Sequence, residues 1–421
     1  MALIVHKYGG TSMGSPQRIR NVAHRVAKWR KAGHQMVVVV SAMSGETNRL
    51  LALAKEVSPH PDPRELDVVA TTGEQVSIGL LAMALKDLGV DAVSLTGWQV
   101  GVFTDNAYMK ARIDTISQER IRRELDAGRV VIVAGFQGID PDGNITTLGR
   151  GGSDTSAVAI AAALHADECL IFTDVDGVYT TDPRICSDAK RLPNITFEEM
   201  LELASAGSKV LQIRSVEFAG KFKVPCRVLS SLTDPDLPVE EEAVSGTLIT
   251  YEEDPKMMEK ALVTGIAASR SDAKVTLHDV SDTPGVASSI LQPIADANID
   301  VDMIVQNVSV QGKTDFTFTV PRGDLEKTVQ VLKEQVLPKA GGEGIVTNDR
   351  IAKISVVGIG MRTHSGVASR MFKALSEEGI NILMISTSEI KVSIVVDEKY
   401  TELAVRALHH AFGLENGPSE V

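Results

Sequence analysis

The chain of 421 residues is too long for one ordinary hydrophobic core, so its length predicts two or three domains. The formal net charge of −12 argues against nucleic acid or an anionic membrane as the main partner. Aromatic residues make up 4% of the chain and glycines number 34, a balance typical of α/β proteins with many tight turns.

The three cysteines, Cys169, Cys186 and Cys226, are scattered and form no C-x-x-C pair, which indicates a reduced, cytoplasmic environment. The apolar run at the N-terminus is too short for a signal peptide, and no segment approaches the length of a membrane span. We therefore expect a soluble cytoplasmic protein with neither a nucleic-acid nor a membrane partner.

Up to about residue 230, apolar runs alternate with stretches of helical spacing. We expect strands at 2–6, 36–41, 92–95, 130–136 and 169–174, and helices at 16–32, 73–88, 118–127 and 154–164. The strands are almost continuous in Val, Ile and Leu, as in a mainly parallel sheet that is covered on both faces. Such sheets bind ligands at the loops that follow their strands.

The first of these loops carries Lys7 followed by Gly9, Gly10 and two hydroxyl residues. A lysine at a strand end can neutralise a phosphoryl group in transfer, while glycine amides bind the phosphate oxygens. A surface lysine before a turn is the alternative reading. Neither a P-loop pattern nor G-x-G-x-x-G is present here, which argues against P-loop kinases and dehydrogenases.

Two further loops carry polar candidates. Ser41 and Thr47 lie in the small, hydroxyl-rich sequence after the second strand. Glu74 opens a predicted helix, where an acid commonly serves only as a partner of the helix dipole; it could also hold a substrate ammonium. His60 stands in a proline-rich loop that is either a lid or a linker.

Residues 147–163 form a glycine-rich turn that runs into an alanine-rich helix beginning near Ser153 and Asp154. Gly151 and Gly152 free the backbone N–H groups to face an anion, and the positive end of the helix dipole points to the same place. Arg150 adds a planar donor group suited to a carboxylate or a phosphate. The alternative is an ordinary turn in which Asp154 is only an N-cap.

A fourth loop, from Phe172 to Arg184, holds three aspartates, two aromatic residues and an arginine. Spaced aspartates are found in calcium loops, but no glutamate stands at the EF-hand spacing. The pattern therefore favours magnesium bound together with a nucleotide.

Beyond residue 233 the pattern changes. Residues 234–260 are acidic and poor in core residues, and we expect them to connect two domains. An internal repeat follows, in which the Gly-Val-Ala-Ser sequence at 285–288 recurs at 366–369. Each copy reads as β-α-β-β-α-β, the ferredoxin-like arrangement.

The second copy lacks its own fourth strand, and the apolar residues 261–269 are of a suitable type to supply it. We therefore expect the first module, residues 270–348, to be inserted in a second module made of 261–269 and 349–421. The remaining boundaries expected are a catalytic domain at 1–233 and the connection at 234–260.

The motifs KYGGTS, SAMSGETN, TTGEQVS, TLGRGGSDTSA and TDVDGVYTTDPR, in this order, resemble those of aspartate kinases of the amino-acid kinase superfamily. The two repeats resemble the paired ACT regulatory modules of the same family. The resemblance covers nearly the whole chain and implies a monofunctional enzyme. It would phosphorylate the β-carboxylate of L-aspartate with ATP, the first step of lysine, threonine and methionine biosynthesis.

The resemblance also assigns roles to residues. Lys7, Arg150 and Asp154 are the expected catalytic residues. The expected aspartate-binding residues are Ser41, Thr47, Glu74, Arg150, Gly151, Gly152, Ser153 and Asp154. The expected ATP-binding residues are Lys7, Gly9, Gly10, Thr173, Asp174, Tyr179, Asp182, Arg184 and Lys209. Mg²⁺ is expected to arrive with ATP, and no tightly bound organic cofactor is expected.

In the ACT modules, the resemblance implies an effector site for lysine, threonine or both. The expected residues are Asp282, Gly285, Val286, Ala287 and Gln306 in the first copy and Asn381 and Ile382 in the second. His364 and Ser365 replace Thr283 and Pro284, so the two copies should not bind identically, and the second copy is either a binding site or only structural. Exposed strand edges in such modules favour a homo-oligomer.

Two other functions are compatible with the sequence. A glutamate or N-acetylglutamate kinase shares the fold, and a catalytically silent amino-acid sensor would keep it for binding alone. The choice of effectors, the oligomer size and the presence of a short regulatory subunit are not decided by the sequence.

Overall fold

The computed structural model describes residues 1–208, 210–251, 262–307, 312–340, 342, 344–359, 361 and 366–420. The predicted positions Lys209, Ala261, His364 and Ser365 lie outside the described residues. The chain divides into two compact units. The first comprises Met1–Tyr179, Arg191–Ala204 and Lys209–Met258, and the second comprises Thr180–Lys190, Ser205–Ser208 and Glu259–Val421.

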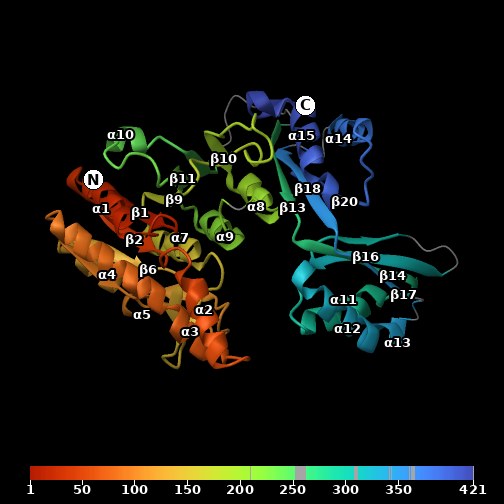
Figure 1. Ribbon diagram of the computed structural model, residues 1–421, viewed down its shortest axis with the longest axis horizontal. Coiled ribbons are helices and arrows are strands. Elements are labelled where there is room, and N and C mark those ends of the chain that lie inside the picture. Colours follow the sequence, from red (N-terminus) through yellow and green to blue (C-terminus); the bar gives the residue numbers. More distant parts are fainter. Residues whose placement is uncertain are drawn as a thin grey trace. The chain divides into compact units, whose positions relative to one another are not determined.

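The first unit contains an eight-stranded, mainly parallel sheet (Figure 1), which confirms the predicted α/β class. In spatial order its strands are β10 (Asn194–Thr196), β12 (Thr247–Thr250), β11 (Cys226–Ser230), β9 (Glu168–Thr173), β1 (Leu3–Tyr8), β2 (Gln35–Val40), β6 (Val130–Ala134) and β3 (Ala92–Leu95). Only the β11–β12 pairing is antiparallel. A smaller sheet has the order β5 (Ile113–Ile116), β4 (Val102–Thr104), β7 (Gln137–Ile139) and β8 (Ile145–Thr147).

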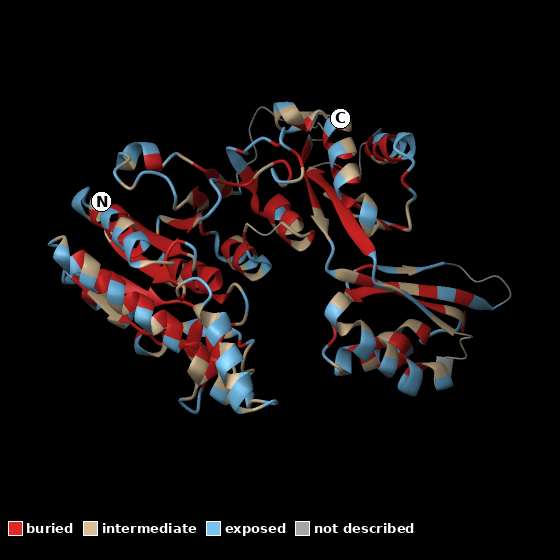
Figure 2. Cartoon of the chain, in the orientation of Figure 1, coloured by how far each residue is buried: buried red, intermediate tan, exposed pale blue. Residues whose placement is uncertain are grey.

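The helices of this unit are α1 (Pro16–Lys31), α2 (Glu46–Val57), α3 (Pro63–Ala70), α4 (Thr72–Asp87), α5 (Gly97–Val100), α6 (Glu119–Asp126), α7 (Gly152–Leu164), α8 (Phe197–Ser205), α9 (Ile213–Phe222) and α10 (Val239–Glu242). Helix α1 begins where Pro16 supplies a fixed φ and the Ser15 hydroxyl accepts the N–H of Arg18. Buried and exposed residues alternate along α1 and α4 (Figure 2), as expected for helices that cover one face of a sheet.

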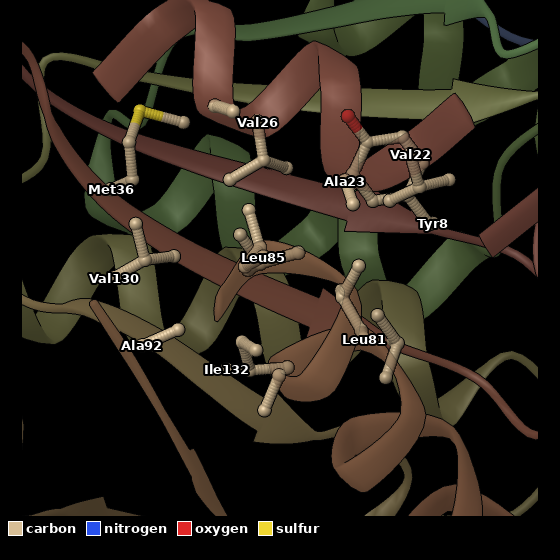
Figure 3. Close-up of a cluster of buried hydrophobic side chains, with 14 of the residues drawn as sticks. Tyr8, Val22, Ala23, Val26, Met36, Leu81, Leu85, Ala92, Val130 and Ile132 are labelled. Atoms are coloured by element: carbon tan, nitrogen blue, oxygen red, sulfur yellow. The ribbon is translucent and has the colours of Figure 1, made fainter. Parts of the chain in front are cut away.

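The core on that face is formed by α1, α4 and every second residue of the central strands (Figure 3). Tyr8 of β1, Met36 of β2 and Ile132 of β6 contribute to it, together with Val22, Leu81 and other helix residues. Because side chains alternate along a strand, Lys7 and Ile171 point to the opposite face, against which α7 packs. This alternation decides which strand residues face α7 and which face the core formed with α1 and α4.

Within the described residues, the run Pro63–Asp87 is long and apolar enough to span a membrane, with a mean hydropathy of 1.4. The expectation that no segment approaches this length was therefore wrong. The run comprises two helices, and Ile78, Leu81 and Leu85 pack in the core beside the sheet. The run therefore supplies core residues of the first unit, and 44% of its most apolar window is buried.

The second unit contains two antiparallel sheets of the ferredoxin-like kind. The first has the order β15 (Ile304–Gln306), β16 (Lys313–Pro321), β14 (Asp272–Ser281) and β17 (Gly344–Asn348). Its helical segments are α11 (Val286–Asp296), the short 3₁₀ turn Arg322–Asp324, α12 (Leu325–Val331), the π-helical turn Leu332–Val336 and α13 (Leu337–Ala340).

The second sheet has the order β19 (Met384–Thr387), β20 (Lys391–Asp397), β18 (Ile351–Ile359), β13 (Leu262–Ser269) and β21 (Ser419–Glu420). It is covered by α14 (Gly366–Glu377) and α15 (Thr401–Ala411), with short 3₁₀ turns at Glu398–Tyr400 and Leu414–Asn416. Strand β13 pairs antiparallel with β18, so a strand that precedes the first repeat completes the sheet of the second.

Residues 239–250, which the sequence places in a connection between domains, form α10 and β12 of the first unit. One of their acidic residues is buried and paired with basic and aromatic side chains. The buried Glu242 accepts hydrogen bonds from Arg25 Nε and Trp29 Nε1, each at 2.6 Å, and lies 3.1 Å from Lys28 Nζ.

Candidate active site

The ends of β1, β2 and β9, together with the start of α7, surround a polar pocket of about 440 Å³. Its lining comprises Lys7, Gly9, Gly10, Thr11, Ser41, Ala42, Met43, Ser44, Gly45, Thr47, Asn48, Asp154, Ile171, Thr173, Asp174 and Val210. All three strands run parallel, so their carboxyl ends meet here, as the rule for ligand sites in α/β sheets requires.

Lys7 and Asp154 form the charged pair of this pocket. Lys7 Nζ lies 2.6 Å from Asp154 Oδ1, and the two side chains are 9% and 12% exposed. Lys7 is in register with Val39 and Ile171, so it projects from the centre of the sheet towards α7. Ion pairs with so little access to water are weakly screened by salt. Asp154 therefore holds the Lys7 ammonium in place at the wall of the pocket.

The glycines after β1 keep this charge accessible. A Cβ at Gly9 would lie 3.3 Å from Lys7 Nζ, and one at Gly10 would lie 3.1 Å from the carbonyl oxygen of Ala42. Side chains at these positions would crowd the ammonium group and the loop opposite. The absence of Cβ atoms leaves room for an anion between the two loops.

The start of α7 differs from the sequence-based expectation. The helix begins at Gly152, its N-cap is Gly151 with φ = +69°, and no side chain caps it. The reading of Asp154 as an N-cap is therefore wrong, because its carboxylate turns to Lys7 instead. Ser153 Oγ lies 2.8 Å from Ser41 Oγ and joins this turn to the end of β2.

The surroundings of Gly151 and Gly152 leave no room for a side chain. A Cβ at Gly151 would lie 1.7 Å from Gln212 Cγ, and one at Gly152 would lie 2.8 Å from Leu148 Cβ. Arg150 is exposed and is not among the residues that line the pocket. The turn thus presents backbone amides at the helix start while its arginine extends into solvent.

Glu74, in the first turn of α4, is only 3% exposed. Its Oε1 accepts the N–H of Ala42 at 3.0 Å, whereas Oε2 is buried without a hydrogen-bond partner among the described residues. Burial raises the pKa of Glu74 to about 7. A buried, unpaired carboxylate oxygen beside the loop that lines the pocket is a strong acceptor for a cation.

The loop after β9 was predicted to hold a nucleotide. Thr173 donates to Asp174 Oδ1 at 3.1 Å, and both residues line the pocket. Tyr179 OH donates to Asp176 Oδ1 at 2.8 Å. Asp182 and Arg184 belong to the second unit, where two guanidinium nitrogens of Arg184 contact the Asp182 carboxylate at 2.8–3.2 Å.

Sequence reasoning missed part of the lining. Thr11 follows β1, Ser44 and Gly45 directly precede α2, and Asn48 lies in its first turn; all four line the pocket. Strand-end position and hydroxyl content were the available signals for Thr11 and Ser44. Nothing local marked Val210, which reaches the pocket from a segment after α8.

The predicted effector residues fall at matching places in the two sheets of the second unit. Gly285, with φ = +96°, is the N-cap of α11, and Val286 and Ala287 begin that helix. Asp282 lies in the preceding loop, and Gln306 ends the edge strand β15. Asn381 and Ile382 precede β19, the corresponding edge strand of the other sheet.

Comparisons with known proteins agree with this architecture. The amino acid kinase family matches residues 2–230, and the ACT domain matches residues 278–336 and 354–412. An aspartate kinase of Stutzerimonas stutzeri is 61% identical over 415 residues, covering 99% of this chain and 98% of that protein. An aspartokinase of Pseudomonas aeruginosa is 60% identical over 415 residues, covering 99% of this chain and 98% of that protein.

Among solved structures, Escherichia coli aspartokinase III in complex with aspartate and ADP has a TM-score of 0.82 at 27% identity. The match covers 98% of this chain and all of that one. The same enzyme in complex with lysine and aspartate has a TM-score of 0.73 at 27% identity, covering 97% and 99%. The chain therefore belongs to the amino acid kinase family, among the aspartate kinases, and carries two ACT regions in its C-terminal part.

Proposed function

We propose that the pocket transfers the γ-phosphoryl group of ATP to the β-carboxylate of L-aspartate, with Lys7 stabilising the charge in transfer. The buried pair of Lys7 and Asp154 between two glycine-bearing loops carries this proposal. The acceptor carboxylate has an ordinary pKa near 4, so it is already ionised at neutral pH and needs no general base. The protein then has to position two anions and neutralise their charge.

For aspartate we assign the side of the pocket formed by the ends of β2 and α7. Ser41 and Ser153 meet there, and Thr47 lines the same cavity. Glu74 would accept the substrate ammonium through its unpaired oxygen. Arg150 would turn in from solvent to pair with a substrate carboxylate, while the turn at Gly151 and Gly152 supplies backbone amides.

For ATP we assign Gly9, Gly10, Thr173, Asp174 and Tyr179, with Asp182, Arg184 and Lys209 as further contacts. A kinase that uses ATP requires a divalent metal, and we propose Mg²⁺, which enters as part of the substrate. Mg²⁺ needs only one or two carboxylates because phosphates and waters complete its shell. Asp174, at the pocket wall, is the carboxylate that fits, and no group of three or more His, Cys, Asp or Glu side chains that could hold a metal ion by itself gathers among the described residues.

For the C-terminal part we propose feedback inhibition by lysine, threonine or both. The E. coli relative was solved with lysine and aspartate, which supports an amino-acid effector. Asp282, Gly285, Val286, Ala287 and Gln306 would form the first site, and Asn381 and Ile382 mark the corresponding place in the second. The module boundaries proposed are 270–348 for the first and 261–269 with 349–421 for the second.

We further propose a cytoplasmic homo-oligomer that catalyses the first step of lysine, threonine and methionine biosynthesis. Its three cysteines are buried and free, as expected in a reducing compartment. Both sheets of the second unit end in short edge strands with exposed apolar residues, namely Ile304 and Ile385, which a second copy could cover.

The test is acyl-phosphate formation from ATP, Mg²⁺ and L-aspartate, trapped with hydroxylamine, with and without lysine and threonine. Product that these amino acids suppress is the expected result. Product from glutamate or N-acetylglutamate but not from aspartate would keep the fold and overturn the substrate. No product from any of the three, with amino-acid binding retained, would identify a sensor.

A further inference from the structure

The loop predicted to bind the nucleotide continues past Tyr179 into the segment Thr180–Lys190, which belongs to the second unit. Leu192 N donates to Val178 O at 2.8 Å, Tyr179 pairs with Arg191, and Thr180 N donates to Lys190 O at 2.8 Å. The segment Thr180–Lys190, which contains Asp182 and Arg184, is built into the second unit.

Thr180 is the point at which the segment is fastened. Its carbonyl oxygen accepts the N–H of Ile266 of β13 at 2.7 Å. A Cβ at Gly265 would lie 2.9 Å from the same oxygen, and the pairing of β13 with β18 shifts register between Val263 and Gly265. A glycine at a strand irregularity is the arrangement that lets another backbone approach closely.

The side chain of Thr180 makes a second, buried attachment. Thr180 Oγ1 lies 3.0 Å from Nε2 of His409 on α15, and the two residues are 0% and 1% exposed. The same hydroxyl accepts the N–H of Lys190 at 3.0 Å, so its hydrogen is free to be donated to Nε2. This arrangement needs a neutral ring with the proton on Nδ1.

The surroundings of His409 keep the ring neutral. Burial lowers its pKa, and the neighbouring His410 acts in the same direction, whereas Glu415 and Asp188 raise it. The part of α15 that precedes His409 packs in the core of this module through Val405 and Leu408, so the ring has little freedom to move.

Ile185 attaches a second point of the segment to the same module. Ile185 packs against that core, and its carbonyl oxygen accepts a hydrogen bond from Arg406 Nη1 at 3.4 Å. Thr180 and Ile185 therefore fix the backbone on both sides of Asp182 to a regulatory module. Asp182 and Arg184, the proposed nucleotide contacts, both lie between Thr180 and Ile185 in the sequence.

We propose that His409 is a positioning residue for nucleotide binding: through Thr180 it holds the backbone that runs from Tyr179 to Arg184. The inference rests on the proposed role of that loop in ATP binding. A loop that is already ordered loses less conformational entropy when the ligand binds, so anchoring favours affinity without a direct contact.

The experiment compares His409→Ala with His410→Ala in the full chain. His410 is the neighbouring residue on the same helix, and its side chain is 89% exposed. Loss of one buried hydrogen bond is expected to raise the KM for ATP about five- to tenfold in His409→Ala, with the KM for aspartate changed less than about twofold. His410→Ala should match the parent protein in both constants.

Two further variants separate positioning from folding. His409→Gln keeps an acceptor near the place of Nε2 and should restore most of the ATP affinity. Thr180→Val keeps the branched shape without the hydroxyl and should resemble His409→Ala, while the double variant should be no worse than either single one.

The outcomes are distinct. If the parent chain forms no aspartyl phosphate, the proposed function fails. If it does, and His409→Ala has the parent's KM for ATP, the positioning role is overturned. Equal rises in both KM values, a lowered melting temperature and no rescue by His409→Gln would also overturn it in favour of a purely structural role.

Discussion

At the scale of single residues, Lys7 carries the chemical argument. Its ammonium is fixed by Asp154 in a pocket with few other cations, so its removal takes away the charge that opposes the phosphoryl oxygens. We expect Lys7→Ala to lower kcat about 10²- to 10³-fold, the size of effect known for groups that stabilise developing charge. Hydroxamate formation measures this, and Lys31→Ala, which removes an exposed lysine, is the control. Equal rates for the two variants would contradict the role.

Glu74 gives the site a pH dependence. Its pKa of about 7 is raised by burial, so the carboxylate that would hold the ammonium forms only as pH rises through neutrality. We expect kcat/KM for aspartate to increase from pH 6 to pH 8, and Glu74→Gln to lower its value and flatten the profile. A parent-like profile in Glu74→Gln would assign the titration to another group.

The same group affects stability with the opposite sign. The folded protein holds this proton more tightly than the unfolded chain, so the contribution of neutral Glu74 is complete below about pH 4.5 and is lost as pH rises through about 7. Glu74→Gln should therefore remove part of the decline in unfolding free energy between pH 5 and pH 8. Denaturant unfolding at several pH values measures this difference, with activity and stability expected to change in opposite directions.

At the scale of elements, the turn before α7 depends on Gly151. Alanine there would meet both the positive φ and a Cβ lying 1.7 Å from Gln212 Cγ. Gly33 also has positive φ, but nothing lies within 4 Å of its Cβ position, so Gly33→Ala isolates the backbone cost of about 1–2 kcal/mol. We expect Gly151→Ala to lower the unfolding free energy by more than Gly33→Ala and to raise the KM for aspartate. Equal stabilities of the two variants would show that Gln212, at the start of α9, moves aside without cost.

The attachment of α1 to α10 depends on a buried charge. Arg25 donates to Glu242 and to the carbonyl oxygens of Ser231 and Thr233, and all three partners follow β11. Arg25→Ala leaves Glu242 buried without its main cation, and we expect a loss of about 3–5 kcal/mol in unfolding free energy. Arg18→Ala, exposed on the same helix, should change it by less than about 0.5 kcal/mol. A small loss in Arg25→Ala would mean that Lys28 takes over the pairing.

At the scale of the whole molecule, the repeat offers a paired test of regulation. Ala287 and Ala368 occupy equivalent positions at the starts of α11 and α14. If the first module binds the effector, Ala287→Leu should raise the inhibitor concentration for half-inhibition at least about tenfold, while Ala368→Leu should have a smaller effect. A larger effect of Ala368→Leu would place the effector site in the second module. If neither substitution changes inhibition, the effector does not bind at the start of α11 or of α14.

The sequence by itself determined the α/β class, the family and the places where loops follow strands. These depend on local information: residue periodicity, glycine positions and motifs in a fixed order. The period of two in β1 also places Lys7 on the face opposite Tyr8. Helix starts were less accurate, since the N-cap of α7 is Gly151 and depends on backbone conformation rather than on a capping side chain.

Only the tertiary structure decided which distant residues meet. Arg25 and Glu242 are 217 positions apart, and Thr180 and His409 are 229 positions apart. The pKa of Glu74 likewise depends on how much of the chain excludes water from it. Pairing and desolvation arise when separate elements pack together, so they are properties of the folded chain and leave no mark in any local stretch of the sequence.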